Sequence, residues 1–265
     1  FCDLKGKRVY SVLNNHKLEC QLELNDSPAA VGWLSDGRML ITSLFDRKLL
    51  SIENGKIRDY ADLFSVAPGY GHDMVVSKND TIYISASGFY PAYGIKPVKS
   101  NIMMIEPSGR LSVAVSQVGY PNGLALINDD SQMIVAETFA ANLALYDVNT
   151  NGKLTNKRSF YSFDKEGFQV TFDEQGVPRD LSRYYPDGVD YDDQRKILWV
   201  ASPGKNQVLG IRKNQIQFQV DTQGIPFDCV VGGDNHDTLF IGAATPAPGG
   251  WVGQIEFIKL EQEHS

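Results

Sequence analysis

Two short motifs place an amide and a carboxylate at equivalent positions of the chain. Asn122 is the middle residue of a Pro-Asn-Gly motif at 121–123, and Asp187 is the middle residue of a Pro-Asp-Gly motif at 186–188. An apolar run follows each motif, and a second apolar run follows about ten residues later. This spacing is typical of one β-unit repeated around an axis. Because the residue after the proline opens the strand nearest that axis, we expect both side chains to point toward a shared centre. The repeat therefore predicts a site as well as a fold.

The elements that must position these residues are short antiparallel strands. Looser copies of the motif begin at Pro28 and Pro226. Turn pairs such as Asp36-Gly37 and Asn54-Gly55 supply the positive φ that tight hairpins need. The four copies are each followed by a second apolar strand, at 39–42, 133–136, 197–201 and 239–242. In the first complete unit the pattern predicts four antiparallel strands, at 30–34, 39–42, 48–52 and 57–60.

The repeat predicts an all-β fold, a six-bladed β-propeller with an incomplete first blade. We expect inner strands to begin near residues 29, 72, 122, 187 and 227, with His72 opening the unit that lacks the proline. Residues 1–28 have room for only two strands, at 8–13 and 18–24, so the inner strand of the first blade is expected upstream of Phe1. The predicted blades of this single domain are 1–26, in part, and then 27–62, 70–116, 120–163, 185–221 and 225–260.

Composition narrows the class of protein. The 265 residues are 42% hydrophobic and 22% charged, as in globular domains, and no apolar stretch is long enough to span a bilayer. The net charge of −7 argues against a nucleic-acid partner, since such binding needs clusters of Lys and Arg. Three cysteines without CxxC spacing do not form a disulfide framework, although pairing of Cys2 with Cys20 stays open. We expect a cytoplasmic protein that is a monomer or weak dimer, with neither membrane nor nucleic acid as partner.

The chain resembles the family of senescence marker protein, gluconolactonase and luciferin-regenerating enzyme, whose members are six-bladed propellers. The resemblance rests on the order and spacing of several motifs together rather than on any single motif. The matching segments lie at 30–38, 73–76, 120–123, 134–139, 186–189, 232–233 and 238–240.

The resemblance implies a metal site and a reaction. Members hold one divalent cation on the axis through a glutamate, an asparagine and an aspartate, and Asn122 and Asp187 match the last two. The glutamate is expected upstream of this chain. Ca²⁺ is the expected cation, with Zn²⁺, Mg²⁺ and Mn²⁺ as alternatives, because carboxylate and amide oxygens suit such ions. A cation there would polarise the carbonyl of a lactone or similar ester, with Asp187 as ligand and general base.

Three further residues are candidates for contact with the substrate. His72 takes the place of a family asparagine that contacts metal-bound water or substrate, and Asp73 follows it in both patterns. A histidine there could act as a base or a nitrogen ligand, or could only hydrogen-bond a neighbouring loop. Glu137 could reach the substrate or brace a loop between blades. Aromatic residues at 89–93 and 184–185 are candidates for the mouth of the site, and packing explains them about as well.

Three classes of function stay open at this point. The first is a metal-dependent lactone hydrolase, which the resemblance favours. The second is a metal-independent propeller enzyme, such as a lyase, that depends on His72. The third is a small-molecule-binding protein without turnover, because a fold alone does not establish chemistry. Without the upstream glutamate, we expect weak metal affinity in this chain.

Overall fold

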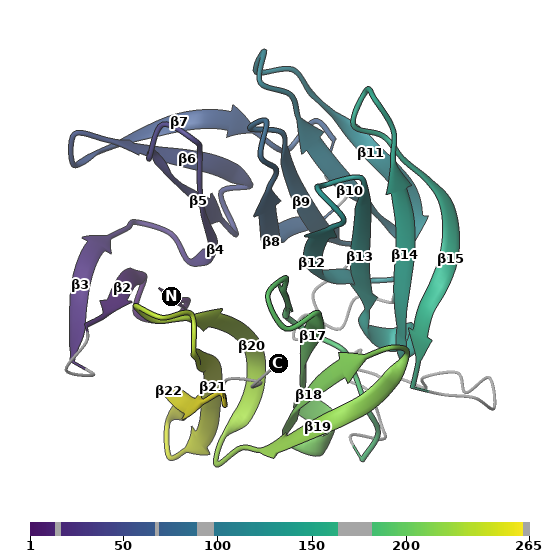
Figure 1. Cartoon of the computed structure of the whole chain (residues 1–265). Coiled ribbons are helices and arrows are strands. Elements are labelled where there is room, and N and C mark those ends of the chain that lie inside the picture. The colour runs from purple at the N-terminus through teal and green to yellow at the C-terminus, as the bar shows by residue number, and fades with distance from the viewer. Residues whose placement is uncertain (14–16, 67–68, 89–97, 164–181, 262–265) are drawn as a thin grey trace.

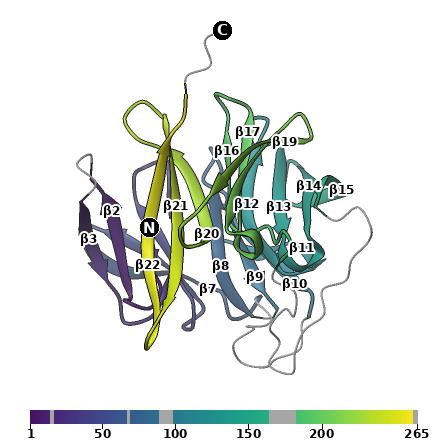
Figure 2. The same ribbon diagram turned by 90° about the horizontal axis from the view of Figure 1, so that it is seen from below.

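Six antiparallel β-sheets surround a common axis in the computed structural model (Figure 1). The structure describes residues 1–13, 17–66, 69–88, 98–163 and 182–261. Figure 2 shows the sheets from the side, with their strands running from one face of the molecule to the other. The predicted all-β, six-bladed propeller is confirmed.

The sheets follow one another in chain order, so each is a blade. Blade one contains β1 (Cys2–Asp3), β2 (Arg8–Val12) and β3 (Leu18–Glu23). Blade two contains β4 (Pro28–Trp33), β5 (Met39–Ser43), β6 (Lys48–Glu53) and β7 (Lys56–Asp62). Blade three contains β8 (Tyr70–Val76), β9 (Ile82–Ser87), β10 (Ser100–Ile105) and β11 (Leu111–Val118).

The remaining blades repeat this order from the axis outward. Blade four contains β12 (Pro121–Ile127), β13 (Gln132–Glu137), β14 (Asn142–Val148) and β15 (Leu154–Ser162). Blade five contains β16 (Val189–Asp192), β17 (Ile197–Ser202), β18 (Gln207–Arg212) and β19 (Gln215–Asp221). Blade six contains β20 (Ile225–Gly232), β21 (Thr238–Ala247) and β22 (Gly250–Lys259). Two 3₁₀ turns, η2 (Thr138–Ala140) and η3 (Pro203–Lys205), join the second and third strands of blades four and five.

A β-bulge interrupts the start of four inner strands. The register shifts between Pro28 and Val31 in β4, and between Pro121 and Leu124 in β12. Equivalent shifts surround His72 in β8 and Phe227 in β20. A bulge adds an unpaired residue and re-aims its side chain. In each of these blades the bulge therefore gives a distinct backbone setting to the second residue of the motif, the one that follows the proline or Gly71.

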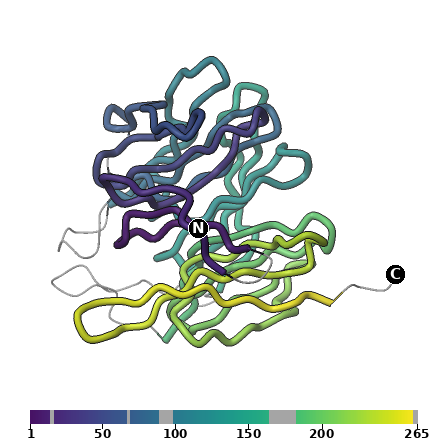
Figure 3. The backbone as a smooth tube through the Cα atoms, turned by 90° about the vertical axis from the view of Figure 1, so that its left-hand side faces the viewer, coloured from purple at the N-terminus to yellow at the C-terminus, as the bar shows by residue number. Residues whose placement is uncertain are grey.

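Apolar side chains between neighbouring blades form the core. Five buried clusters lie between consecutive blades, from blades one and two through blades five and six. The cluster between blades four and five includes Leu143 and Leu198, both fully buried. None of these five clusters of described residues joins blade six to blade one, although Figures 1 and 3 show the two sheets as neighbours.

Two further observations bear on the sequence-based expectations. Cys2, Cys20 and Cys229 are free thiols, so Cys2 and Cys20 do not pair. In the described part of the chain, no helix has the length and apolar character needed to cross a bilayer.

Candidate active site on the propeller axis

Backbone contacts between blades hold the beginnings of the inner strands together. The Gly123 N–H donates to the Asp187 carbonyl at 3.2 Å, which joins blades four and five. The Gly188 N–H donates to the Phe227 carbonyl at 2.9 Å, which joins blades five and six. Blades three and four are joined by the Leu124 N–H, which donates to the Asp73 carboxylate at 3.1 Å. The residues nearest the axis are thus fixed relative to one another.

The glycines of the two motifs are required by this close approach. A Cβ on Gly123 would lie 2.5 Å from the Asp187 carbonyl oxygen. A Cβ on Gly188 would lie 2.0 Å from Oδ1 and 2.7 Å from Cα of Asp228. Neither position has room for a side chain, so glycine allows adjacent inner strands to touch.

Asn122 and Asp187 meet at the axis, as their equivalent positions in the repeat predict. The Asn122 amide donates a hydrogen bond to Thr138 Oγ1 at 3.2 Å and lies close enough to the Asp187 carboxylate to stabilise its charged form. Its Oδ1 is not used in the bond to Thr138 and can accept a hydrogen bond or coordinate. One amide oxygen and one carboxylate are therefore presented together.

Three aspartates, Asp73, Asp187 and Asp228, interact electrostatically in this region. Burial and the charge of Asp228 raise the pKa of Asp73 to about 8. Burial and the charges of both neighbours raise the pKa of Asp187 well above its ordinary value. Asp228 keeps a solvent-accessible surface, yet the surrounding protein removes enough hydration to raise its pKa to about 6. Carboxylates that repel one another in this way retain protons or attract a cation.

Asp228 is the site residue that sequence analysis missed. Its carboxylate accepts a hydrogen bond from the Cys229 N–H at 2.8 Å, just as that of Asp73 accepts one from the Met74 N–H at 2.7 Å. Both aspartates follow a bulged residue. Aligning the inner-strand starts Gly-His-Asp at 71–73 and Pro-Phe-Asp at 226–228 would have revealed the equivalence.

His72 lies next to this cluster as a neutral imidazole. Burial lowers its pKa to about 4, so it is uncharged near pH 7. Its buried Nε2 has no hydrogen-bond partner among the described residues. The ring stacks on Tyr120, with centroids 5.7 Å apart and an interplanar angle of 28°. The structure thus leaves one nitrogen of this side chain buried and without a partner among the described residues.

Glu137 is turned into blade four. It is buried, with 4% of its surface exposed, and its Oε1 accepts an ion-paired hydrogen bond from Lys157 Nζ at 2.6 Å. Gly119 N–H and Asn142 Nδ2 donate further hydrogen bonds to it, at 3.4 and 3.3 Å. These contacts favour the bracing role for Glu137, and substrate contact stays a prediction.

The aromatic residues proposed for the mouth of the site fall into two groups. Residues 89–93 lie outside the described part of the chain. Tyr185 is buried, and its backbone N–H donates to Ser202 Oγ at 3.1 Å. Tyr184 packs against Phe163 with ring centroids 5.5 Å apart. Packing therefore accounts for Tyr185.

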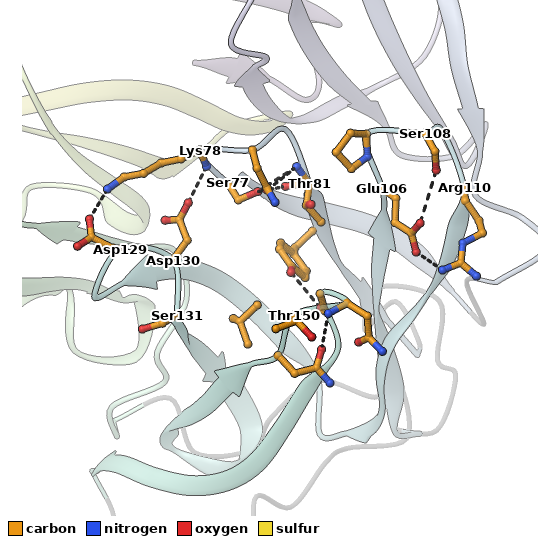
Figure 4. Close-up of a pocket in the computed structure, with 17 residues that line it drawn as sticks. Ser77, Lys78, Thr81, Glu106, Ser108, Arg110, Asp129, Asp130, Ser131 and Thr150 are labelled. Atoms are coloured by element: carbon orange, nitrogen blue, oxygen red, sulfur yellow. Dashed lines mark hydrogen bonds and ion pairs between the residues drawn. The ribbon is translucent and has the colours of Figure 1, made fainter.

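A second concave region lies at the other ends of the strands in blades three and four. This cavity of about 590 Å³ is lined by turn residues (Figure 4). Its charged side chains pair with one another, Lys78 with Asp129 at 2.6 Å and Arg110 with Glu106. The carboxylates of Asp129 and Glu106 are thus engaged by cations, so the axial residues are the stronger candidate site.

The comparisons with known proteins identify the family of the chain. Residues 1–245 match the family model described as SMP-30/Gluconolactonase/LRE-like region. The chain belongs to this family.

Individual relatives are more distant. A gluconolactonase of Zymomonas mobilis is 27% identical over 184 residues, which are 65% of this chain and 48% of that protein. The match therefore spans about half the length of this relative. A gluconolactonase structure from Xanthomonas campestris has a TM-score of 0.72 at 18% identity, over 96% of this chain and 80% of the other. Regucalcin from Agrobacterium tumefaciens, a calcium-binding protein, has a TM-score of 0.73 at 15% identity, over 91% and 76%. At such identities, these structures show the shared fold alone.

The axial residues fit an oxygen-preferring cation in part. In the described ranges, no three His, Cys, Asp or Glu side chains are grouped as metal ligands. Asn122 and Asp187 nevertheless present two oxygen donors side by side, and Asp73 and Asp228 add negative charge. Hard cations prefer such donors and complete their coordination with water or substrate oxygen.

Proposed function

We propose that this chain is the catalytic propeller of a lactone hydrolase, with the reaction taking place at the axial site. The observation that carries the proposal is the close approach of the two motifs, in which the Gly123 N–H bonds the Asp187 carbonyl and the Asn122 amide lies near the Asp187 carboxylate. Family membership supports it, and so does the similarity to a gluconolactonase. Hydrolysis fits because the site combines oxygen donors for a cation with carboxylates whose raised pKa suits proton transfer near neutral pH.

We further propose that Asn122 Oδ1 and the Asp187 carboxylate hold a divalent cation, with Ca²⁺ preferred. Oxygen donors favour a hard cation, whereas coordination by His72 Nε2 would favour Zn²⁺. When bound, the cation supplies polarisation of the lactone carbonyl. The Asn122 amide holds Asp187 in place through its hydrogen bond.

In the proposed hydrolysis, Asp187 and His72 have different roles. Water forms a bond to the acyl carbon, and a carboxylate of the site, Asp187 in our proposal, accepts its proton. The bond from the acyl carbon to the ring oxygen breaks, and that oxygen leaves with a proton to give the hydroxy acid. His72 is neutral and a weak base, so it serves better as a hydrogen-bonding contact for the substrate than as the proton acceptor.

Asp187→Asn tests this proposal. We expect kcat/KM for lactones to fall by about 10²- to 10³-fold, and Ca²⁺ binding measured by calorimetry to weaken. Asp193→Asn is the matched control, because Asp193 is exposed and pairs only at the surface, with Lys196. Turnover that persists in chelator and is lost in His72→Ala would replace the proposal with a metal-independent reaction. Saturable binding without product would indicate a binding protein.

A further inference from the structure

A row of aromatic rings runs from His72 along blades three, four and five. After the stack of His72 on Tyr120, the Tyr120 and Phe139 centroids are 4.6 Å apart, and those of Phe139 and Tyr185 are 6.3 Å apart. Tyr120 and Phe139 are half-buried, so part of each ring surface is accessible. The row passes the axial site on the side of Asn122, whose amide bonds Thr138, the neighbour of Phe139.

Tyr120 has an unfavourable backbone conformation. Its φ is +51°, which is uncommon for residues other than glycine. It also precedes Pro121, and residues before proline are normally extended. Such strain persists only where the surroundings enforce it, and it is concentrated at ligand-binding and active sites.

The contacts that enforce this conformation come from the end of β13. The Thr138 N–H donates to the Tyr120 carbonyl at 3.3 Å, and the Gly119 N–H donates to Glu137. Glu137 is itself held by Lys157 at 2.6 Å. An ion pair between buried Glu137 and half-exposed Lys157, together with two hydrogen bonds, thus fixes the short link at 119–120. The result is that the Tyr120 ring lies against the imidazole beside the site.

From this geometry we infer that Tyr120 determines specificity, its ring forming an apolar wall that selects lactones with an apolar substituent over hydroxyl-rich sugar lactones. Glu137 is the positioning residue for that ring. Recognition of a sugar needs several polar groups around the ring, whereas among the described residues this row contributes aromatic faces and one neutral histidine. An alkyl group on the wall gains from burial, by roughly fourfold in affinity for each methylene covered. The inference rests on the proposed hydrolysis.

Tyr120→Gly is the decisive variant, because glycine adopts a positive φ without strain and the ring is removed while the backbone is kept. The probes are δ-valerolactone, δ-decalactone and glucono-δ-lactone. For the unmodified protein we expect kcat/KM to be highest for the alkyl-substituted lactone. In Tyr120→Gly this preference should fall by about tenfold, through KM rather than kcat. Tyr120→Phe should retain it, because the hydroxyl is not needed.

Two further variants complete the test. Glu137→Gln should reduce the preference, again through KM, because the link at 119–120 loses its ion-paired support. Phe64→Ala is the control, because this exposed ring lies outside the row and contacts Arg47. Hydrolysis with an unchanged preference in Tyr120→Gly, or a higher kcat/KM for glucono-δ-lactone, would overturn this inference alone. Absence of hydrolysis of all three lactones would overturn the proposed function and this inference together.

Discussion

The junction of blades four and five and the junction of blades six and one are built in different ways. At the first, a fully buried apolar cluster adjoins the hydrogen bond from the Gly123 N–H to the Asp187 carbonyl. At the second, no cluster of described residues is buried between the sheets. Blade six instead leaves apolar side chains exposed, at Phe227, Val230, Trp251 and Phe257. Asn122 and Asp187 lie at the tightly packed junction of blades four and five. The buried cluster there therefore supports the two side chains that we propose as cation ligands.

The largest difference between the two junctions should appear in the free energy of unfolding of variants at each. Leu143→Ala removes a fully buried side chain between blades four and five, and we expect the free energy of unfolding to fall by about 2 to 5 kcal/mol. Phe257→Ser on β22 replaces a side chain that is 39% exposed, and we expect a much smaller loss, about 0.5 kcal/mol. Urea denaturation measures both. Equal losses would show that the two junctions are supported alike.

A smaller difference in stability is expected between alanine substitutions at two glycines, Gly188 and Gly253. Gly188→Ala would place a methyl group against Asp228, so we expect a loss of about 1 to 3 kcal/mol and weaker cation binding. At Gly253 on β22 an added Cβ meets nothing within 4 Å, and Gly253→Ala should leave stability nearly unchanged. Thermal melting and calorimetric titration with Ca²⁺ distinguish them. If Gly188→Ala binds the ion as tightly as the unmodified protein, the close contact of inner strands is not needed for the site.

A pH dependence of stability links the two regions through Asp73 and Asp228. Their pKa values are about 8 and about 6 in the folded protein, and about 4 in an unfolded chain. Between pH 4 and 8 the folded state binds more protons than the unfolded state, so stability falls as pH rises. In chelator we expect the melting temperature to drop by several degrees from pH 5 to pH 8. Added Ca²⁺ should offset the drop most strongly at pH 8.

The matched variants for the pH experiment are Asp73→Asn and Asp193→Asn. The first should flatten the pH dependence, because it removes one of the interacting carboxyl groups. The second changes an exposed aspartate and should leave the dependence as it was. A melting temperature that rises between pH 5 and pH 8 in chelator would contradict the raised pKa values.

Most of the fold could be predicted from the sequence repeat, because turn pairs and strand spacing are local signals. It also brought out Asn122 and Asp187, since equivalent positions around an axis must converge. Asp228 was missed because the copy in blade six has Phe227 where blades three, four and five have His72, Asn122 and Asp187. The conformation of Tyr120 was hidden for a different reason. It depends on contacts with Glu137 and Thr138, which lie about 17 residues further along the chain and cannot be predicted from the local sequence around Tyr120.

The bulge at the start of the inner strands has a consequence for how such a site can change. Blades two, three, four and six share this backbone feature, yet they present Ala29, His72, Asn122 and Phe227 at the re-aimed position. The main chain thus tolerates a methyl group, an imidazole, an amide or a phenyl ring in the same setting. New reactivity can accordingly evolve by single replacements at these places, while the scaffold that carries them stays as it is.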